Sequence, residues 1–457
     1  MTTDQTSSTA EGVAPKKGKT YFRWVVMVLI FLVYTLAASD RANIGIVLPF
    51  VKKEMNLTNT EAGLIVSLFF VGYSIAQIPS GFLVKRIGVR IIFPICMVLT
   101  SFFTGLLGTS SSVLAFKLNR MALGFAEAPL PVAMLSTINR WFPPNEKGTA
   151  AGFFLAAAKF GPVLMPPIGA VIIASFSWHY IFFFCALPGV FLALLWFIFV
   201  SNDPSRSPYT SAAERAHISE IAVGNAEQAS VDATSDQTNG IDKFKTLDNY
   251  LRARPVDPLS SNKAVFKSLN IWGIAIGYLM MTGIINVILA WLPMYLTNEK
   301  HLSLLSVGFI ASAPFIGGVI GNPLGGLFSD RVMGKRRKPN ILIASLSSVV
   351  MMYALVFAPN QPFALAFLLF MTGLLLNIGY ASFTIYPAGL TTKEVYPLAV
   401  SVVNTGGQAG GALFPLLTGI ILDSYGWDAV FGFLSAASML AFIIMIFVVE
   451  PKKRIER

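Results

Sequence analysis

Four ionisable residues stand inside two long apolar stretches of this chain. Asp40 and Arg41 are neighbours in the first stretch, and Arg120 and Glu127 lie seven residues apart in the fourth. A charged side chain at the centre of a bilayer costs about 3 kcal/mol or more, so residues of this kind usually face a polar cavity and act there. Two arginines and two acids therefore predict a site that binds an anion and moves a proton.

The two residue types divide this chemistry between them. An arginine stays protonated and can hold a carboxylate through two parallel hydrogen bonds. Burial favours the neutral form of a carboxyl group, which suits it to carry a proton. We therefore expect Arg41 and Arg120 to attract the substrate, and Asp40 and Glu127 to couple its movement to protons. The alternative is that Arg120 and Glu127 form an ion pair with a purely structural role in holding the helices together.

Helical spacing sets how these side chains are aimed. Arg120 and Glu127 are two turns apart, so they share one face about 10 Å apart along the axis. Gly124 between them leaves room for a neighbouring helix or a ligand. Asp40 and Arg41 point about 100° apart and need not pair with each other.

Lys159 is a further charged residue in the middle of an apolar stretch, the fifth along the chain. It adds positive charge to the same cavity, which indicates a ligand with a second negative group or with fewer hydroxyl groups. The alternatives are a lysine neutralised by burial or one paired with Glu127.

Transmembrane helices are the elements that must position these residues. Only 12% of the 457 residues are charged and 54% are hydrophobic, whereas soluble domains carry about 25% charged residues. Twelve stretches are long and apolar enough to span a bilayer. They cover residues 24–50, 60–83, 91–110, 112–138, 149–173, 179–200, 270–296, 304–328, 340–358, 362–388, 398–421 and 429–449. The sequence thus predicts an all-α membrane protein.

The predicted spans fall into two groups of six. We expect an N-terminal tail (1–22), a six-helix bundle (23–200), a central loop (201–268), a second six-helix bundle (269–449) and a C-terminal tail (450–457). A short surface helix over 210–222, capped at Thr210 or Ser211, is expected in the loop. Most Lys and Arg residues outside the spans lie on one side, which places both termini and the loop in the cytoplasm.

Composition also excludes several function classes. The net charge of +11 follows from this loop asymmetry, so no nucleic-acid partner is expected. Cys96 and Cys185 lie inside apolar stretches and are expected to pack in the core, not to form a disulfide. The three histidines show no metal-ligand spacing, and neither a metal nor a cofactor is expected.

The two halves resemble each other. "GFLVKRIGVR" (81–90) follows the second span and "GLFSDRVMGKRR" (326–337) follows the eighth, aligning Gly81 with Gly326 and Arg86 with Arg331. Residues 159–182 likewise align with 408–431, which pairs Lys159 with Gln408. Such repeats predict two pseudo-symmetric bundles with the substrate site between them near the midplane.

The repeated loop resembles the signature of the major facilitator superfamily. The resemblance implies that this loop latches the cytoplasmic gate, with Gly81 and Arg86 in the first copy and Asp330 and Arg331 in the second. Lys85 stands where an acid is usual, so the first copy departs from the pattern.

The charged helices have a closer resemblance. "DRANIGIVLPFV" (40–51), "RMALGFAEAP" (120–129) and "RWFPPNEKG" (140–148) are similar to the anion:cation symporter family. Its bacterial members are permeases for sugar acids such as galactonate, glucarate and hexuronates. The resemblance implies import of an organic anion by proton symport, across a bacterial inner membrane and through a monomer. Asp40 and Glu127 match its proton-coupling acids, and Arg41 matches a substrate-binding arginine.

Further binding residues follow from the same resemblance. Tyr73 in "YSIAQIP" and Asn404 match positions that contact substrate, and Gln408 is one turn beyond Asn404. Two positions depart from the galactonate type: Lys159 replaces a common glutamine and Ala38 a common tyrosine. These departures argue against a simple transfer of galactonate specificity.

Three other functions agree less well with the residues. Gly161-Pro162 is typical of proton-coupled efflux antiporters of drugs or metabolites, but Leu164 and the residues after it replace the glycine pair that follows in those proteins. A non-transporting sensor would need a signalling domain, and the central loop is not one. No catalytic spacing indicates an enzyme. No phosphate-binding loop is visible, so an ion gradient is the expected energy source.

Overall fold

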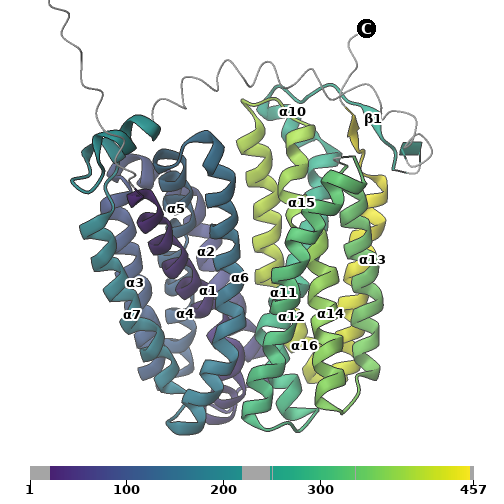
Figure 1. Ribbon diagram of the computed structural model, residues 1–457. Coiled ribbons are helices and arrows are strands. Elements are labelled where there is room, and N and C mark those ends of the chain that lie inside the picture. The colour runs from purple at the N-terminus through teal and green to yellow at the C-terminus, as the bar shows by residue number, and fades with distance from the viewer. Residues whose placement is uncertain (1–20, 219–247, 250, 335, 453–457) are drawn as a thin grey trace, which may run out of the picture.

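The computed structural model describes residues 21–218, 248–249, 251–334 and 336–452, and it is helical throughout its two main parts (Figure 1). Eleven helices of the described chain are long and apolar enough to cross a membrane. The first part holds α1 (Phe22–Glu54), α2 (Asn59–Ile87), α3 (Val89–Thr109), α4 (Val113–Glu127), α5 (Pro129–Trp141), α6 (Pro144–Ser175) and α7 (His179–Phe199). The second holds α11 (Leu269–Asn298), α12 (Leu304–Leu327), α13 (Lys338–Ala354), α14 (Pro362–Ile378), α15 (Tyr380–Ile385) and α16 (Tyr396–Phe447).

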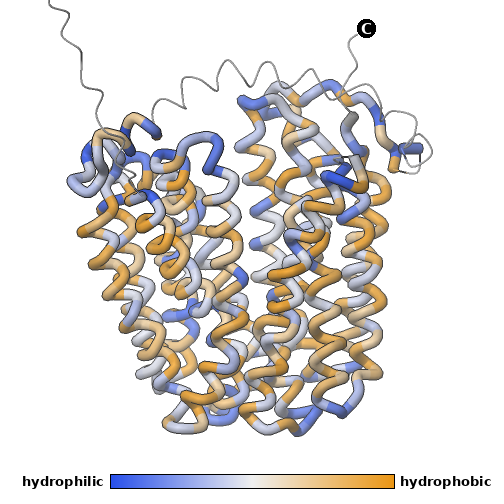
Figure 2. The backbone as a smooth tube through the Cα atoms, viewed as in Figure 1, coloured by the Kyte–Doolittle hydropathy of each residue, from blue (hydrophilic) through white to orange (hydrophobic). Residues whose placement is uncertain are grey.

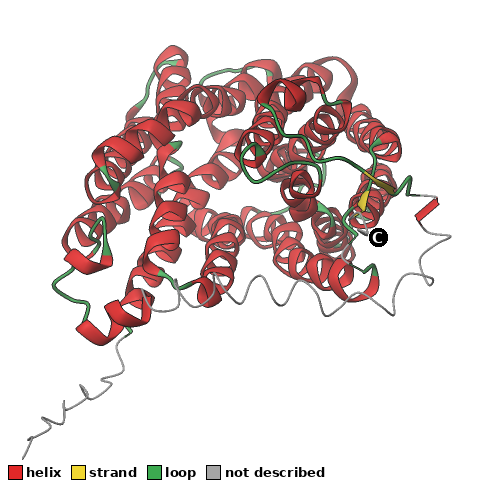
Figure 3. Ribbon diagram, turned by 90° about the horizontal axis from the view of Figure 1, so that it is seen from above, coloured by secondary structure: helices red, strands yellow, loops and turns green. Residues whose placement is uncertain are grey.

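Shorter elements lie between these helices or after the last of them. They are η1 (Pro204–Arg206), β1 (Arg254–Pro255), α10 (Asn262–Lys267), the π-helical turn η2 (Phe328–Val332), η3 (Leu355–Phe357), η4 (Tyr386–Gly389) and β2 (Pro451–Lys452). Apolar residues dominate the flanks of both bundles, as the hydropathy colouring shows (Figure 2). Viewed from above, the helices form two groups side by side (Figure 3).

Helix α16 accounts for the difference between eleven helices and the twelve predicted spans. Its 52 residues would extend about 78 Å if straight, more than twice the thickness of a hydrocarbon core of about 30 Å. Its helical geometry breaks at Gly426, where φ is 78°. Glycine adopts this left-handed conformation without a Cβ clash. The break divides α16 into two crossings, so the predicted twelve-span fold is confirmed.

The internal repeat is visible in the packing. A Cβ added to Gly161 in α6 would lie 2.6 Å from the Thr35 carbonyl oxygen of α1. A Cβ added to the aligned Gly410 in α16 would lie 2.1 Å from the Leu279 carbonyl oxygen of α11. Each glycine therefore lets the fifth crossing of its half approach the first, and the two halves are built alike.

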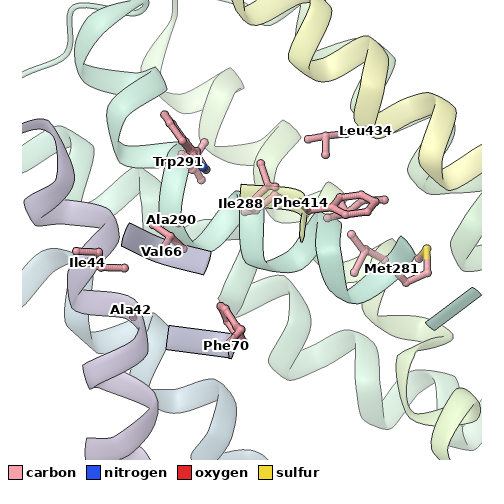
Figure 4. Packing of buried hydrophobic residues seen from close by; sticks show 14 of the residues in the cluster. Ala42, Ile44, Val66, Phe70, Met281, Ile288, Ala290, Trp291, Phe414 and Leu434 are labelled. Atoms are coloured by element: carbon pink, nitrogen blue, oxygen red, sulfur yellow. The ribbon is translucent and has the colours of Figure 1, made fainter. Parts of the chain in front are cut away.

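The two bundles contact each other toward one end of the molecule. There a Cβ on Gly45 of α1 would lie 2.2 Å from the Leu289 carbonyl oxygen of α11. The Ser312 hydroxyl of α12 donates to the Val163 carbonyl oxygen of α6 at 2.8 Å. Apolar side chains of α1 and α2, among them Ile44 and Phe70, pack toward α11 and α16 in the same region (Figure 4). We call this the closed end.

The other end carries α10 and β1, and here the ribbons of the two bundles lie farther apart (Figure 1). At Gly81, Gly148, Gly152 and Gly326 an added Cβ would meet nothing within 4 Å. We call this the open end. The structure is therefore closed across one side of the molecule and open on the side that the sequence predicts to be cytoplasmic.

A carboxylate fastens the closed end. Asp423 of α16 accepts the backbone N–H groups of Asn59 (2.9 Å) and Thr60 (2.8 Å), the first residues of α2. It also accepts the Thr60 hydroxyl at 2.7 Å. The first N–H groups of a helix lack internal partners and attract negative charge. Asp423 thus caps a helix of the opposite bundle.

One described part of the central segment is bound to the first bundle and another to the second. Ser211 accepts the N–H of Glu214 at 3.2 Å and so caps a helical turn over 212–218. This agrees with the predicted start of the surface helix, whose remaining residues 219–222 lie outside the described ones. The buried Glu214 carboxylate pairs with Arg23 of α1. In the second bundle, Arg336 holds Asp248 through two hydrogen bonds, of 2.6 and 2.9 Å.

Cys96 and Cys185 are both free and buried. Their predicted role in core packing is confirmed.

Replacing Gly410 by Ala is expected to lower the thermal unfolding midpoint of the purified protein, because the new methyl group cannot fit against the Leu279 carbonyl. Overpacking of this kind usually costs about 1–3 kcal/mol. Gly432→Ala is the matched control, since nothing lies within 4 Å of its Cβ position in the same helix. Equal midpoints for the two variants would contradict the packing account.

Asp423→Ala is expected to loosen the closed end, because loss of a helix cap costs about 0.5–2 kcal/mol. The readout is the maleimide labelling rate of a cysteine placed at the buried Val66 of α2, measured in detergent. The rate should rise severalfold. Asp428→Ala, which removes an exposed acid of the same helix without touching the cap, should leave the rate unchanged. If both variants label alike, Asp423 does not hold this end.

Candidate functional site

An ion pair between α1 and α4 lies at the centre of the first bundle. Arg41 Nε donates to Glu127 Oε1 at 2.6 Å, and the Glu127 side chain is fully buried while 23% of the Arg41 side chain is exposed. Helix α4 ends at Glu127, since Pro129 and Pro131 follow and proline has no N–H to continue the helix. Glu127 therefore lies where the fourth membrane crossing is divided into α4 and α5.

Arg120 is almost fully buried but does not pair with Glu127. No carboxylate of the described chain lies within 4 Å of its guanidinium group, and its Nε and Nη1 atoms have no hydrogen-bond partner there. Its Cζ atom lies 5.1 Å from the centre of the Phe69 ring of α2, and Arg41 approaches the same ring at 5.9 Å. Both cations thus rest on one aromatic ring, an arrangement that partly offsets their desolvation.

The structural Arg120–Glu127 ion pair, the alternative to a role in substrate binding, is therefore not formed. Glu127 pairs across helices with Arg41, which leaves Arg120 as a buried cation close to the pair. Gly124 makes this packing possible, since a Cβ there would lie 1.9 Å from the Phe69 carbonyl oxygen.

Asp40 lies on a different side of α1, as the angle between neighbouring helical residues predicts. It is only 1% exposed, its hydrogen bond to Asn43 is long at 3.5 Å, and the Cys185 thiol of α7 is beside it. No cation of the described chain lies within ion-pair distance of it. Asp40 is thus an enclosed carboxyl group with few polar partners.

Lys159 of α6 reaches across to the second bundle. Its Nζ atom lies 4.5 Å from the centre of the Tyr380 ring of α15. The Tyr380 hydroxyl in turn accepts a hydrogen bond of 2.9 Å from Tyr278 of α11. Lys159 makes no ion pair with Glu127 or any other acid of the described chain, so its expected alternative partner is not used.

A small cavity of about 20 Å³, roughly the room for one water molecule, adjoins Lys159. Its other walls belong to the second bundle and are apolar except at Asn377. The Asn377 amide donates to the Gly373 carbonyl, while its Oδ1 atom is buried without a partner in the described chain. An ammonium group and an unsatisfied amide oxygen therefore face the same space.

Two tyrosines lie beside the Arg41 guanidinium group. The ring of Tyr73, one of the predicted site residues, is centred 5.1 Å from Arg41 Cζ. Tyr34 also interacts with Arg41 and Glu127. It interacts with Tyr380 as well, so it links the Arg41–Glu127 ion pair to the second bundle.

Two tyrosines near the charged residues, Tyr34 beside Arg41 and Tyr278 beside Tyr380, were not expected from the sequence. Tyr34 could have been found, because it lies two helical turns before Arg41 and thus on the same face. Tyr278 has no charged neighbour along its helix that would have pointed to it.

Two predicted residues are not brought into this group. Asn404 and Gln408 are half-buried on α16, and their side chains make no hydrogen bond within the described chain. Gly411, one turn beyond Gln408, contacts Phe70 of α2. This part of α16 therefore borders α2 of the first bundle, away from the Arg41–Glu127 ion pair.

The predicted gate residues lie at the open end. Gly81 and Arg86 are exposed there. Asp330 pairs with Arg337 of its own bundle at 2.9 Å, and Arg331 borders an apolar groove. In the described chain the two copies of the motif make no contact with each other, as expected where the bundles are apart. No group of three potential metal ligands occurs among the described residues.

Comparison with known proteins places this geometry in a family. The Major Facilitator Superfamily model matches residues 30–337 and 274–457. A probable galactarate/D-glucarate transporter of Bacillus subtilis is 27% identical over 454 residues, covering 97% of this chain and 95% of that protein. A probable L-galactonate transporter of Escherichia coli is 29% identical over 441 residues, covering 92% and 88%.

Solved structures agree on the fold. A D-xylose-proton symporter superposes with a TM-score of 0.70 at 16% identity, covering 94% of this chain and 98% of that one. A bacterial homologue of the lysosomal transporter Spinster, in an inward-facing and unoccupied conformation, superposes with a TM-score of 0.68 at 15% identity, covering 94% and 95%. With two six-crossing halves and a model match over almost its whole length, the chain belongs to the Major Facilitator Superfamily.

Proposed function

We propose that the protein imports an organic anion, a sugar acid or a related carboxylate, together with protons by alternating access. The observation that carries this proposal is the Arg41–Glu127 ion pair, in which the anion-binding residue is held by a residue that can take up a proton. The sugar-acid transporters among the relatives support the substrate class.

The ion pair supplies a coupling mechanism. While Glu127 is ionised it occupies Arg41 and competes with any other carboxylate. Protonation of Glu127 removes that competition, and the guanidinium group can then form two parallel hydrogen bonds with the substrate. Arg41 Nη2 already lacks a partner in the described chain and is available for one of them. Proton and anion thus favour each other's binding, and linkage makes the effect reciprocal.

The other two charged residues of these helices complete the scheme. Asp40 is a second proton site, enclosed between α1 and α7. Arg120 is a fixed positive charge whose two unpartnered nitrogens raise the affinity of the region for anions. The three cations, counted with Lys159, disfavour a cationic cargo and hence the drug-efflux alternative.

Alternating access assigns roles to the two ends. The open end is cytoplasmic, so the described conformation is the one that releases substrate into the cell. Reopening the other end requires that Asp423 leave the start of α2. The Gly81–Arg86 and Asp330–Arg331 loops would then latch the cytoplasmic side. This orientation places both termini in the cytoplasm of a bacterium, with the chain in the inner membrane.

Lys159 narrows the substrate class. Its ammonium group has no carboxylate partner in the described chain and faces the second bundle, whereas Arg41 faces the first. Tyr34 and Tyr380 lie between these cations. Two cationic poles with hydroxyl groups between them favour a dicarboxylate with a hydroxylated chain over a monocarboxylate.

Glu127→Gln is expected to abolish accumulation driven by an inward proton gradient in proteoliposomes, because the amide cannot be protonated. Exchange of labelled for unlabelled anion should persist, since the neutral amide no longer competes for Arg41. Glu61→Gln, which changes an acid at the start of α2, should keep both activities. Gradient-driven accumulation by Glu127→Gln would contradict the coupling role.

Lys159→Gln is expected to lower the preference for an aldarate over the aldonate of equal chain length by about tenfold, since a lost charged hydrogen bond is worth about 1.5–3 kcal/mol. Binding of the aldonate should change little. Lys159→Arg, which keeps the charge, should retain most of the preference. An equal loss for both ligands would show that Lys159 acts on folding or on the gate and not on selectivity.

A further inference from the structure

An apolar groove of about 870 Å³ runs along the outer face of the first bundle, between α3 and α7. Helices α3 and α7 lie side by side at the outer edge of the first bundle (Figure 1). The groove is lined by Pro94, Val98, Leu187, Pro188, Val190, Phe191, Ala193, Leu194 and Phe197. Many of these side chains are exposed at the molecular surface, including Leu187 (77%) and Phe191 (60%). In a bilayer this surface faces hydrocarbon.

The helices behind the groove are packed tightly. Phe93 stacks on Trp196 with ring centres 3.8 Å apart, and the Trp196 indole donates to the Val89 carbonyl. A Cβ on Gly189 would lie 2.1 Å from the Ser101 hydroxyl oxygen. These contacts hold α3 tightly against α7 behind the groove, so the groove is not a gap between loosely packed helices.

The length of the groove matches one leaflet. From Leu187 to Phe197 helix α7 rises about 15 Å, which is half of a hydrocarbon core of about 30 Å. Phe197 lies near the open end of the molecule, where α7 ends at Phe199. The groove therefore extends from the membrane interface toward the midplane, as a lipid acyl chain does.

A cation stands at the interfacial mouth of the groove. Arg90 is exposed, and its guanidinium carbon lies 5.4 Å from the centre of the Phe197 ring. The Arg90 backbone N–H donates to Asn202, which also accepts from Arg140. Lys85 and Arg86 are also exposed, in the last turn of α2, and precede Arg90 in the chain. Positive charge at this level of the membrane attracts anionic headgroups.

We propose that the α3–α7 groove binds an anionic phospholipid, with an acyl chain along the groove and its phosphate at Arg90. Charge complementarity selects this occupant over a zwitterionic lipid, and the apolar lining selects it over a soluble anion. The groove lies on the outer face of the first bundle, whereas the ion pair lies at its centre, so the site does not depend on the proposed transport function.

The test compares phosphatidylglycerol with phosphatidylcholine of the same acyl chains, added to the purified protein in detergent and counted as retained lipid by native mass spectrometry. Phosphatidylglycerol should be retained preferentially. Arg90→Gln should weaken its retention about fivefold, the effect of one basic residue at an anionic surface. Lys393→Gln, which removes an exposed charge from the second bundle, should have no effect.

Val98→Trp tests the groove itself, because an indole at this exposed position would fill it. Retention of phosphatidylglycerol should fall although Arg90 is intact. Three results would each overturn the proposal: equal retention of the two lipids, unchanged retention in both groove variants, or a dimer that Val98→Trp converts to a monomer. The last would show that a second copy of the chain covers the groove.

Discussion

The high free energy of a charge in hydrocarbon is the constraint on which this structure depends. It explains why Glu127 is found with Arg41 against it, and why both arginines rest on the ring of Phe69. It also explains the glycine at position 124, since α2 must come close enough for that ring to reach the cations. The packing of three helices is thus arranged around one ion pair.

The same constraint connects the site with conformational change. Lys159 belongs to the first bundle, yet its ammonium group contacts a tyrosine of the second. Any rocking of one bundle against the other must alter this contact and the electrostatic surroundings of the cations. The contacts that hold the closed end together, such as those of Gly45 and of Asp423, lie on other parts of the helices than Lys159 does. In the proposed alternating-access mechanism, the bundles would pivot about this polar centre while either end closes.

Much of the fold could be predicted from the sequence, because hydrocarbon imposes a simple rule on span length and charge. The break at Gly426 falls between two predicted spans. The buried charged residues of the candidate site could also be singled out in advance, since charges are conspicuous in apolar helices. The partners of these charged residues could not be predicted. Glu127 pairs with Arg41 and not with Arg120 because of how the helices are rotated and where the prolines after α4 interrupt the helix. Tyr278 had no local signal either, because only the approach of α15 gives its hydroxyl a role.

The central claim is that a proton displaces Glu127 from Arg41 when the anion binds. Calorimetric titration of the purified protein with a sugar acid that it binds, repeated in buffers of different ionisation enthalpy at one pH, counts the protons taken up on binding. The account predicts net proton uptake with the anion in the native protein and a clear reduction of that uptake in Glu127→Gln. Binding without proton uptake, or uptake that Glu127→Gln leaves unchanged, would contradict it.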